Sequence, residues 1–100
     1  MDDALVTFLL DQLDDPSVTA RRMFGGHGIY RGPHMFGIVY DGDVYLKLAP
    51  GYDAPSEREP FRPRPTQTLW SYRLLSAEEL EDRAALQALA QLVLGERAHR

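Results

Sequence analysis

Residues 35–48, MFGIVYDGDVYLKL, decide the fold because two strand-like runs flank the dipeptide Asp41-Gly42. This dipeptide suits a two-residue type I′ turn, in which both central residues need a positive φ. Such a turn fixes the register of the two strands outward from the turn, with the facing pairs Tyr40–Asp43, Val39–Val44, Ile38–Tyr45, Gly37–Leu46, Phe36–Lys47 and Met35–Leu48. The stretch therefore predicts an antiparallel hairpin in which Gly42 is a structural glycine.

The alternation of side chains along a strand divides this hairpin into two surfaces. The aliphatic surface carries Met35, Val39, Val44, Leu46 and Leu48, and is the expected seat of the helices. The aromatic surface carries Phe36, Ile38, Tyr40, Tyr45 and Lys47. Two interpretations of the aromatic surface stay open. It is either a second packed layer, covered for instance by residues 49–66, or a partly open platform for a ligand or partner with Lys47 as its charged member.

The sequence on either side predicts helices at both ends of the chain. Leucines recur at positions 5, 9 and 13 of a helix expected over residues 3–13, which Asp2 or Asp3 can cap and Pro16 ends. At the other end, Ser76 and Glu79 form a capping box ahead of a helical stretch that extends to about residue 98.

The region between the hairpin and the second helical stretch predicts a loop and one more strand. Residues 49–65 contain five of the seven prolines, which favours a loop. Residues 68–75, TLWSYRLL, alternate as a strand with Trp70 and Tyr72 on one face. The predicted fold is α+β: a small antiparallel sheet with a central Asp-Gly hairpin, packed against an N-terminal helix and a long C-terminal helix.

Composition restricts the classes of function. One hundred residues predict a single domain over residues 1–100. The chain has no cysteine, which excludes disulfides and thiolate chemistry, and its net charge of −4 argues against strong non-specific binding to nucleic acid. The acidic start does not resemble a secretory signal, and no apolar run is long enough for a membrane helix. We therefore expect a cytoplasmic protein without membrane association.

A second stretch, RRMFGGHGIY at residues 21–30, raises three interpretations. A phosphate-binding loop needs a helix directly after the glycines, whereas a short strand and a turn follow here. A metal site is disfavoured because no short ligand spacing accompanies the histidines. The glycines Gly25, Gly26 and Gly28 are then structural: residues 21–24 form a strand, the chain bends at Gly25-Gly26, and residues 28–31 resume the strand. Adjacent arginines in a strand point to opposite faces, so at most one of Arg21 and Arg22 shares a face with Lys47.

VTARRMFGGHGIY (18–30) followed by MFGIVYDGDVYLKL (35–48) resembles the N-terminal domain of the TfoX/Sxy family. The resemblance extends over essentially the whole chain, which ends where the full-length regulators continue into a second domain. It implies an α+β domain and a link to natural competence, in which family members act as transcriptional co-activators alongside the cyclic-AMP receptor protein. No cofactor, no metal and no enzymatic activity is expected from it.

Three hypotheses of function follow. The first is a regulatory interaction module that binds a protein partner, by resemblance a transcription regulator, through the partner-binding candidates Arg21, Arg22, Phe24, Tyr30, Tyr45 and Lys47. The second is direct nucleic-acid binding, which needs Arg21, Arg22, Arg62 and Arg64 to converge on one surface. The third is a small-ligand or enzymatic site with Lys47 in a pocket lined by Tyr30, Tyr45 and Trp70. A homodimer through an exposed strand edge or face is a further hypothesis.

Overall fold

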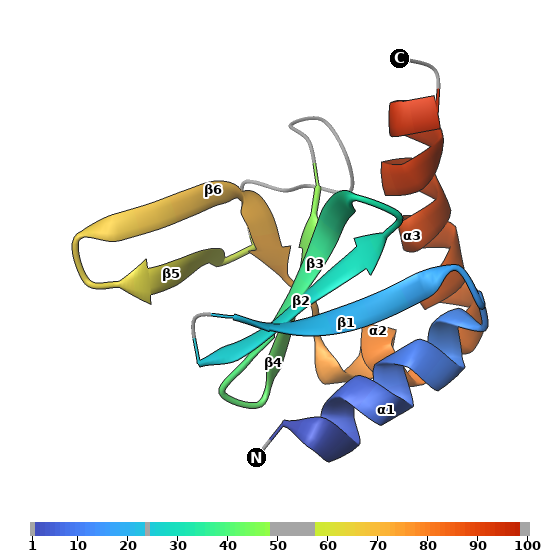
Figure 1. The fold of residues 1–100 in the computed structure, drawn as a ribbon, viewed down its shortest axis with the longest axis horizontal. Coiled ribbons are helices and arrows are strands. Elements are labelled where there is room, and N and C mark those ends of the chain that lie inside the picture. Colours follow the sequence, from blue (N-terminus) through green and yellow to red (C-terminus); the bar gives the residue numbers. More distant parts are fainter. Residues whose placement is uncertain (1, 24, 49–57, 99–100) are drawn as a thin grey trace.

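The computed structural model describes residues 2–23, 25–48 and 58–98. They form one antiparallel sheet in the order β1-β2-β3-β4-β6-β5. Its strands are β1 (Val18–Met23), β2 (Gly26–Arg31), β3 (His34–Tyr40), β4 (Asp43–Lys47), β5 (Pro60–Arg64) and β6 (Gln67–Leu74), and the helices are α1 (Asp3–Leu13), α2 (Ala77–Glu81) and α3 (Arg83–Ala98). Figure 1 shows the helices gathered beside the sheet, while β5 and the outer part of β6 project from it as an arm. The predicted α+β fold is confirmed.

The Asp-Gly hairpin forms with the predicted register next to its turn. Asp41 and Gly42 have φ angles of 51° and 83°, as a type I′ turn requires. Asp2 holds this turn from outside, since its carboxylate accepts hydrogen bonds from the backbone N–H groups of Asp41 (3.1 Å) and Gly42 (2.9 Å). Asp2 also occupies the N-cap position of α1, but its side chain makes no capping hydrogen bond there. The carboxylate predicted to cap the helix therefore stabilises the hairpin turn.

The predicted division of the hairpin into two surfaces is correct near the turn and wrong at Met35 and Phe36. Ile29 of β2 faces Gly37, whereas the next residue, Tyr30, faces Met35, so Phe36 is the extra residue of a β-bulge. The bulge reverses the alternation beyond it. Phe36 is buried in the core on the helix side of the sheet, and Met35 packs on the opposite side.

The helix side of the sheet carries the main core. Its buried members come from both terminal helices and from the strands, namely Val6, Leu9, Leu13, Val18, Ile29, Phe36, Val39, Val44, Leu46, Leu48, Leu75, Leu86, Leu89, Ala90, Val93 and Leu94. The aliphatic surface of the hairpin is thus the seat of the helices, as predicted, with Phe36 in place of Met35.

The opposite side, called here the outer face, carries a second and smaller core. Ile38, Phe61 and Tyr72 are buried in it, and the rings of Tyr40 and Tyr45 lie 5.4 Å and 5.0 Å from the ring of Phe61. Phe61 belongs to β5, so a strand covers this part of the aromatic surface. The loop prediction is therefore wrong for residues 60–64 and lies outside the described residues for 49–57. Prolines are compatible with β5 because it is an edge strand, whose outward backbone groups need no partner in the sheet.

Strand β6 bends sharply, and this bend separates Trp70 from Tyr72. Phe61 of β5 faces Leu69, but the preceding residue of β5 faces Arg73, so several residues of β6 bulge out between the two pairs. Trp70 is 63% exposed, whereas Tyr72 is buried and its hydroxyl donates to the Met35 carbonyl at 3.1 Å. The prediction that Trp70 and Tyr72 share a face is therefore wrong.

The predicted capping box is present, and it also anchors an ion pair. The Glu79 N–H donates to Ser76 Oγ (3.1 Å), and the Ser76 N–H donates to Glu79 Oε1 (2.9 Å). Arg58 donates two hydrogen bonds to the Glu79 carboxylate, one of them at 2.8 Å, and a third to the Leu74 carbonyl. These contacts join the start of the arm, the end of β6 and α2.

The long C-terminal helix is interrupted after one short segment. Asp82 has an extended backbone between α2 and α3. Its carboxylate accepts a hydrogen bond from the Ala85 N–H at 3.0 Å, which is the geometry of an N-cap. The single helical stretch predicted over residues 77–98 is therefore two helices.

Glu79 is expected to stabilise the fold in a pH-dependent way. Hydrogen bonds from Arg58, followed by those from Ser76, lower the pKa of Glu79 from 4.5 to about 2, against the opposing effect of burial. Because the folded-state pKa is lower, the stabilisation is complete above pH 4.5 and is lost as the pH falls toward 2. Glu79→Gln should lower the free energy of unfolding near neutral pH by about 2 kcal/mol, since a partly exposed pair is worth less than a buried one.

Urea unfolding of wild type and Glu79→Gln at neutral and acidic pH tests this expectation. The difference between the two proteins should shrink in acid. Glu78→Gln is the matched control, because Glu78 is an exposed neighbour in the same first turn of α2. An equal loss in both variants, or a difference independent of pH, contradicts the role of the Arg58–Glu79 pair.

Candidate functional site

The glycine block at residues 25–28 allows strand β2 to pack closely against β3. Gly25 has a φ of 78°, which favours glycine, and the chain reverses direction beside it rather than only bending. A Cβ atom on Gly26 would lie 2.4 Å from the Val39 carbonyl oxygen. Gly26 is therefore required by the close approach of two backbones. The predicted bend at Gly25-Gly26, after which the strand resumes, is therefore wrong: residues 26–31 form a second strand that pairs antiparallel with the first.

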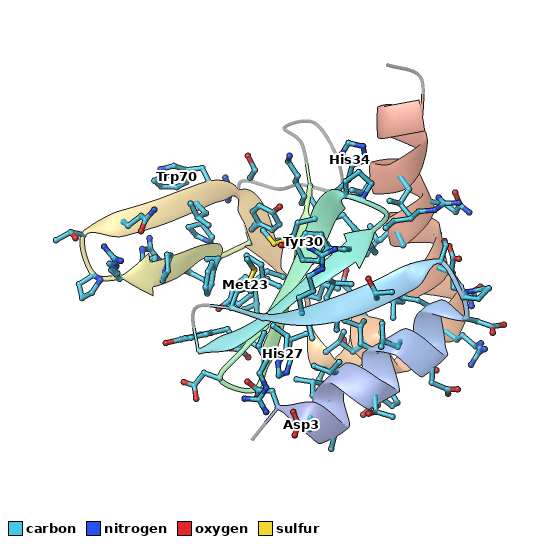
Figure 2. The ribbon with its side chains drawn as sticks, in the orientation of Figure 1. Asp3, Met23, His27, Tyr30, His34 and Trp70 are labelled. Carbon is cyan, nitrogen blue, oxygen red and sulfur yellow. The ribbon has the colours of Figure 1, made fainter. Side chains whose placement is uncertain are left out.

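Gly28 lies under three side chains on the outer face. A Cβ atom on Gly28 would lie 2.5 Å from Met23 Sδ, 2.9 Å from Met35 Sδ and 2.9 Å from Tyr30 Cε1. The two thioethers and the tyrosine ring thus rest directly on the backbone of β2, and the Tyr30 hydroxyl donates to Met23 Sδ at 3.8 Å. Figure 2 shows Met23 and Tyr30 on one side of β1, and His27 and Asp3 on the other side near α1.

Arg21 completes this part of the outer face. It faces Gly28 in the pairing of β1 with β2, and its guanidinium carbon lies 4.7 Å from the centroid of the Tyr30 ring. Arg21 is exposed, whereas Met23 and Tyr30 are half-buried. A cation–π contact of this kind holds the guanidinium in place while its N–H groups stay accessible. We call Arg21, Met23, Gly28, Tyr30 and Met35 the glycine-floored surface.

Arg22 lies on the opposite side of the sheet. Its guanidinium is 3.9 Å from the carboxylate of Asp3 at the start of α1, and His27 Nε2 is 3.5 Å from the same carboxylate. Among the described residues, His27 Nδ1 is buried without a hydrogen-bond partner. The prediction that only one of the two arginines shares a face with Lys47 is confirmed, and that arginine is Arg21.

Tyr45 and Lys47 lie on the outer face, and both are half-buried. Tyr45 packs beneath Phe61, and burial, reinforced by the negative charges of Asp43 and Asp41, raises its pKa. It is therefore a neutral phenol at physiological pH. Lys47 faces Tyr72 in the pairing of β4 with β6. Both residues belong to β4, whereas Arg21 and Tyr30 belong to β1 and β2, and β3 with Met35 lies between them.

The family model of the TfoX N-terminal domain matches residues 9–96 of the chain. The chain belongs to the TfoX N-terminal domain family. No curated protein matched the sequence. In this TfoX N-terminal domain, the stretch VTARRMFGGHGIY (18–30) supplies β1, the reversal and most of β2, and the Asp-Gly hairpin supplies β3 and β4. The two stretches that carried the resemblance are therefore adjacent strands of one sheet.

The predicted partner-binding residues divide into separate locations in the TfoX N-terminal domain. Arg21 and Tyr30 are together, Tyr45 packs under Phe61, and Lys47 is half-buried beside Tyr72. Arg22 is on the helix side, and Phe24 lies outside the described residues. The predicted partner-binding residues do not include Met23, and the predicted side of the sheet is wrong for Met35. Strand alternation alone puts Arg21 and Met23 on one face, so that signal was present in the sequence.

The arginines required by the nucleic-acid hypothesis do not converge. Arg21 and Arg22 are on β1, whereas Arg62 and Arg64 are on β5, and these strands are the two opposite edges of the sheet. Nor does Trp70 line a pocket with Tyr30, because it lies on the exposed bend of β6.

Within residues 2–23, 25–48 and 58–98, no group of three or more histidine, aspartate or glutamate side chains is placed to hold a metal ion. In the same ranges, no helix has the length and apolar character needed to cross a membrane.

Proposed function

We propose that this TfoX N-terminal domain is a protein-binding accessory module of transcription regulation, and that the glycine-floored surface is its contact site. The observation that carries the proposal is the Arg21–Tyr30 contact, 4.7 Å from guanidinium carbon to ring centroid, on the part of the outer face that Phe61 does not cover. Tyrosine and arginine are the residue types that most often dominate protein interfaces.

The surrounding residues favour recognition of a protein. Tyr30 offers a rigid ring with a polar tip, and the two methionines offer polarizable side chains that adapt to a partner's shape. Because Gly28 has no side chain, Met23, Met35 and Tyr30 lie flat against β2. These side chains therefore have little conformational entropy left to lose on binding. The exposed Arg21 guanidinium can bind a partner's carboxylate in a bidentate manner. By the resemblance to competence co-activators, the first partner to test is the cyclic-AMP receptor protein of the same organism.

Isothermal titration calorimetry with that purified regulator tests the proposal. Arg21→Ala is expected to weaken binding at least about tenfold, as the loss of an interface hot spot does. Arg31→Ala is the matched control, because Arg31 belongs to the same strand as Tyr30 but lies near Asp15 on the helix side. Equal weakening by both variants, or none by Arg21→Ala, contradicts the assignment of the surface.

Gly28→Ala gives an independent test of the same surface. The added methyl group meets only the ends of flexible side chains, so Met23, Met35 and Tyr30 can move away and the fold should persist. Their displacement should nevertheless weaken partner binding about as much as Arg21→Ala does. Thermal unfolding confirms that the variant is folded, and unchanged binding in a folded variant would show that the flat arrangement of these side chains is not needed.

A further inference from the structure

The arm formed by β5 and β6 differs in charge from the rest of the chain. Residues 58–74 contain four arginines and one glutamate, a net charge of +3, whereas the whole chain carries −4. Its two exposed arginines on β5, Arg62 and Arg64, are at the sheet edge opposite the glycine-floored surface. An acidic protein thus has a localised cationic projection (Figure 1). A local field of this kind attracts anionic ligands even when the net charge is negative.

The arm also presents an aromatic ring in a fixed position. Trp70 is 63% exposed, and Figure 2 shows it on the side of β6 away from the main body. The guanidinium carbon of Arg73 lies 5.6 Å from the Trp70 ring centroid. Arg73 is itself fixed, because it donates hydrogen bonds to the carbonyl of Trp70 at 2.7 Å and to that of Arg58 at 2.8 Å. The bend of β6 therefore displays the ring rather than burying it.

The cationic side chains lie toward the tip of the same arm. Arg64 faces Gln67 across the turn at the tip and is exposed. Arg62 lies 3.2 Å from the Glu59 carboxylate, an exposed contact that competes weakly with other anions. Within the described part of the chain, Arg64 has no ion-pair partner. Phe61, fully buried, fixes the base of the arm against the sheet.

We propose that this arm binds single-stranded nucleic acid, with Trp70 stacking on a base and Arg64 and Arg62 contacting phosphates. Exposed aromatic rings beside cationic side chains are the usual platform for unpaired bases. A protein partner is less well matched, because the exposed apolar surface of the arm is essentially one ring and a stable protein interface needs about 800 Å² on each side. This nucleic-acid binding is additional to partner binding by the glycine-floored surface, and it involves different residues.

Intrinsic fluorescence provides a direct readout, because Trp70 is the only tryptophan of the chain. Adding a thymidine oligonucleotide of about twelve nucleotides, within the length range that such sites occupy, should quench this fluorescence. Two phosphate contacts predict a shallow salt dependence, in which raising the salt from about 50 to about 150 mM weakens binding about fivefold. A double-stranded oligonucleotide and polyglutamate of equal charge complete the comparison, and both should bind more weakly.

Variants are compared by the fluorescence anisotropy of a labelled oligonucleotide. Trp70→Ala should weaken binding at least about fivefold, Trp70→Phe should retain part of it, and Arg64→Gln should weaken it about two- to threefold. Arg31→Gln is the matched control, since it removes one exposed arginine away from the arm and should have little effect. The proposal is overturned if the single strand causes no quenching at low salt, if the duplex or polyglutamate binds as tightly, or if Arg31→Gln and Arg64→Gln weaken binding equally.

Discussion

Replacing Gly26 by alanine is expected to lower the free energy of unfolding by about 3 kcal/mol, at the upper end of what overpacking costs, or to prevent folding. The new Cβ atom would lie 2.4 Å from the carbonyl oxygen of Val39, which is backbone and cannot rotate away. The only relief is a separation of β2 from β3, which breaks the ladder that supports the whole glycine block. Urea unfolding monitored by circular dichroism measures the loss.

Gly32→Ala serves as the control for this prediction. Gly32 has a φ of 61°, so alanine is strained there, but a Cβ atom would meet nothing within 4 Å. Its cost should be only about 1 kcal/mol, the penalty of the left-handed conformation. If Gly26→Ala costs no more than Gly32→Ala, the close approach of β2 and β3 is not the reason that glycine occupies position 26.

The second large effect is expected at Phe61. Its side chain is fully buried against Tyr40 and Tyr45, and truncation to alanine should cost about 3–4 kcal/mol, as for other buried phenylalanines. Because Phe61 covers Tyr45, the variant should also let the pKa of Tyr45 return toward its ordinary value of 10.0. Chemical denaturation measures the first effect, and a spectroscopic pH titration of the phenols measures the second.

Trp70→Ala is the control within the same arm. Trp70 is mostly exposed, so its removal should change the free energy of unfolding by about 0.5 kcal/mol or less. A large loss for Trp70→Ala with a small loss for Phe61→Ala would mean that the arm packs on the sheet in a different way from that described. The two variants therefore test which aromatic ring is buried.

Local sequence signals were sufficient for the elements that depend on neighbouring residues. The Asp41-Gly42 turn fixes the register of β3 and β4 because the backbone angles that it needs are a property of those two residues. The Ser76–Glu79 capping box is likewise a contact between residues three positions apart. Both could be predicted without knowledge of the rest of the fold.

The sequence-based predictions are wrong at positions whose backbone geometry depends on pairing with another strand. The bulge at Phe36 arises in the pairing of β3 with β2, so the pattern of β3 alone could not reveal that Phe36 and Met35 exchange sides. The bend of β6 at Trp70 depends in the same way on its pairing with β5. Strand β5 was missed because its prolines disfavour a strand in the interior of a sheet but not at an edge.

In the candidate site, too, some features follow from local sequence and others depend on distant strands. That Arg21 and Arg22 point to opposite sides follows from strand alternation, and the structure confirms it. That Tyr45 is covered, and that Met35 belongs with Tyr30 instead, depends on Phe61 and on the bulge. The sequence therefore predicts which candidate residues share the outer face, but not which of them Phe61 covers.

The methionine side chains of the glycine-floored surface offer the most direct test of whether this surface of the TfoX N-terminal domain meets a partner. The chain has three methionines, so a protein labelled with ¹³C at the methionine methyl groups gives three methyl signals. When the regulator that binds in calorimetry is added, the signals of Met23 and Met35 should shift or broaden. Measurable binding with unchanged Met23 and Met35 signals would contradict the proposal that the glycine-floored surface is the contact site.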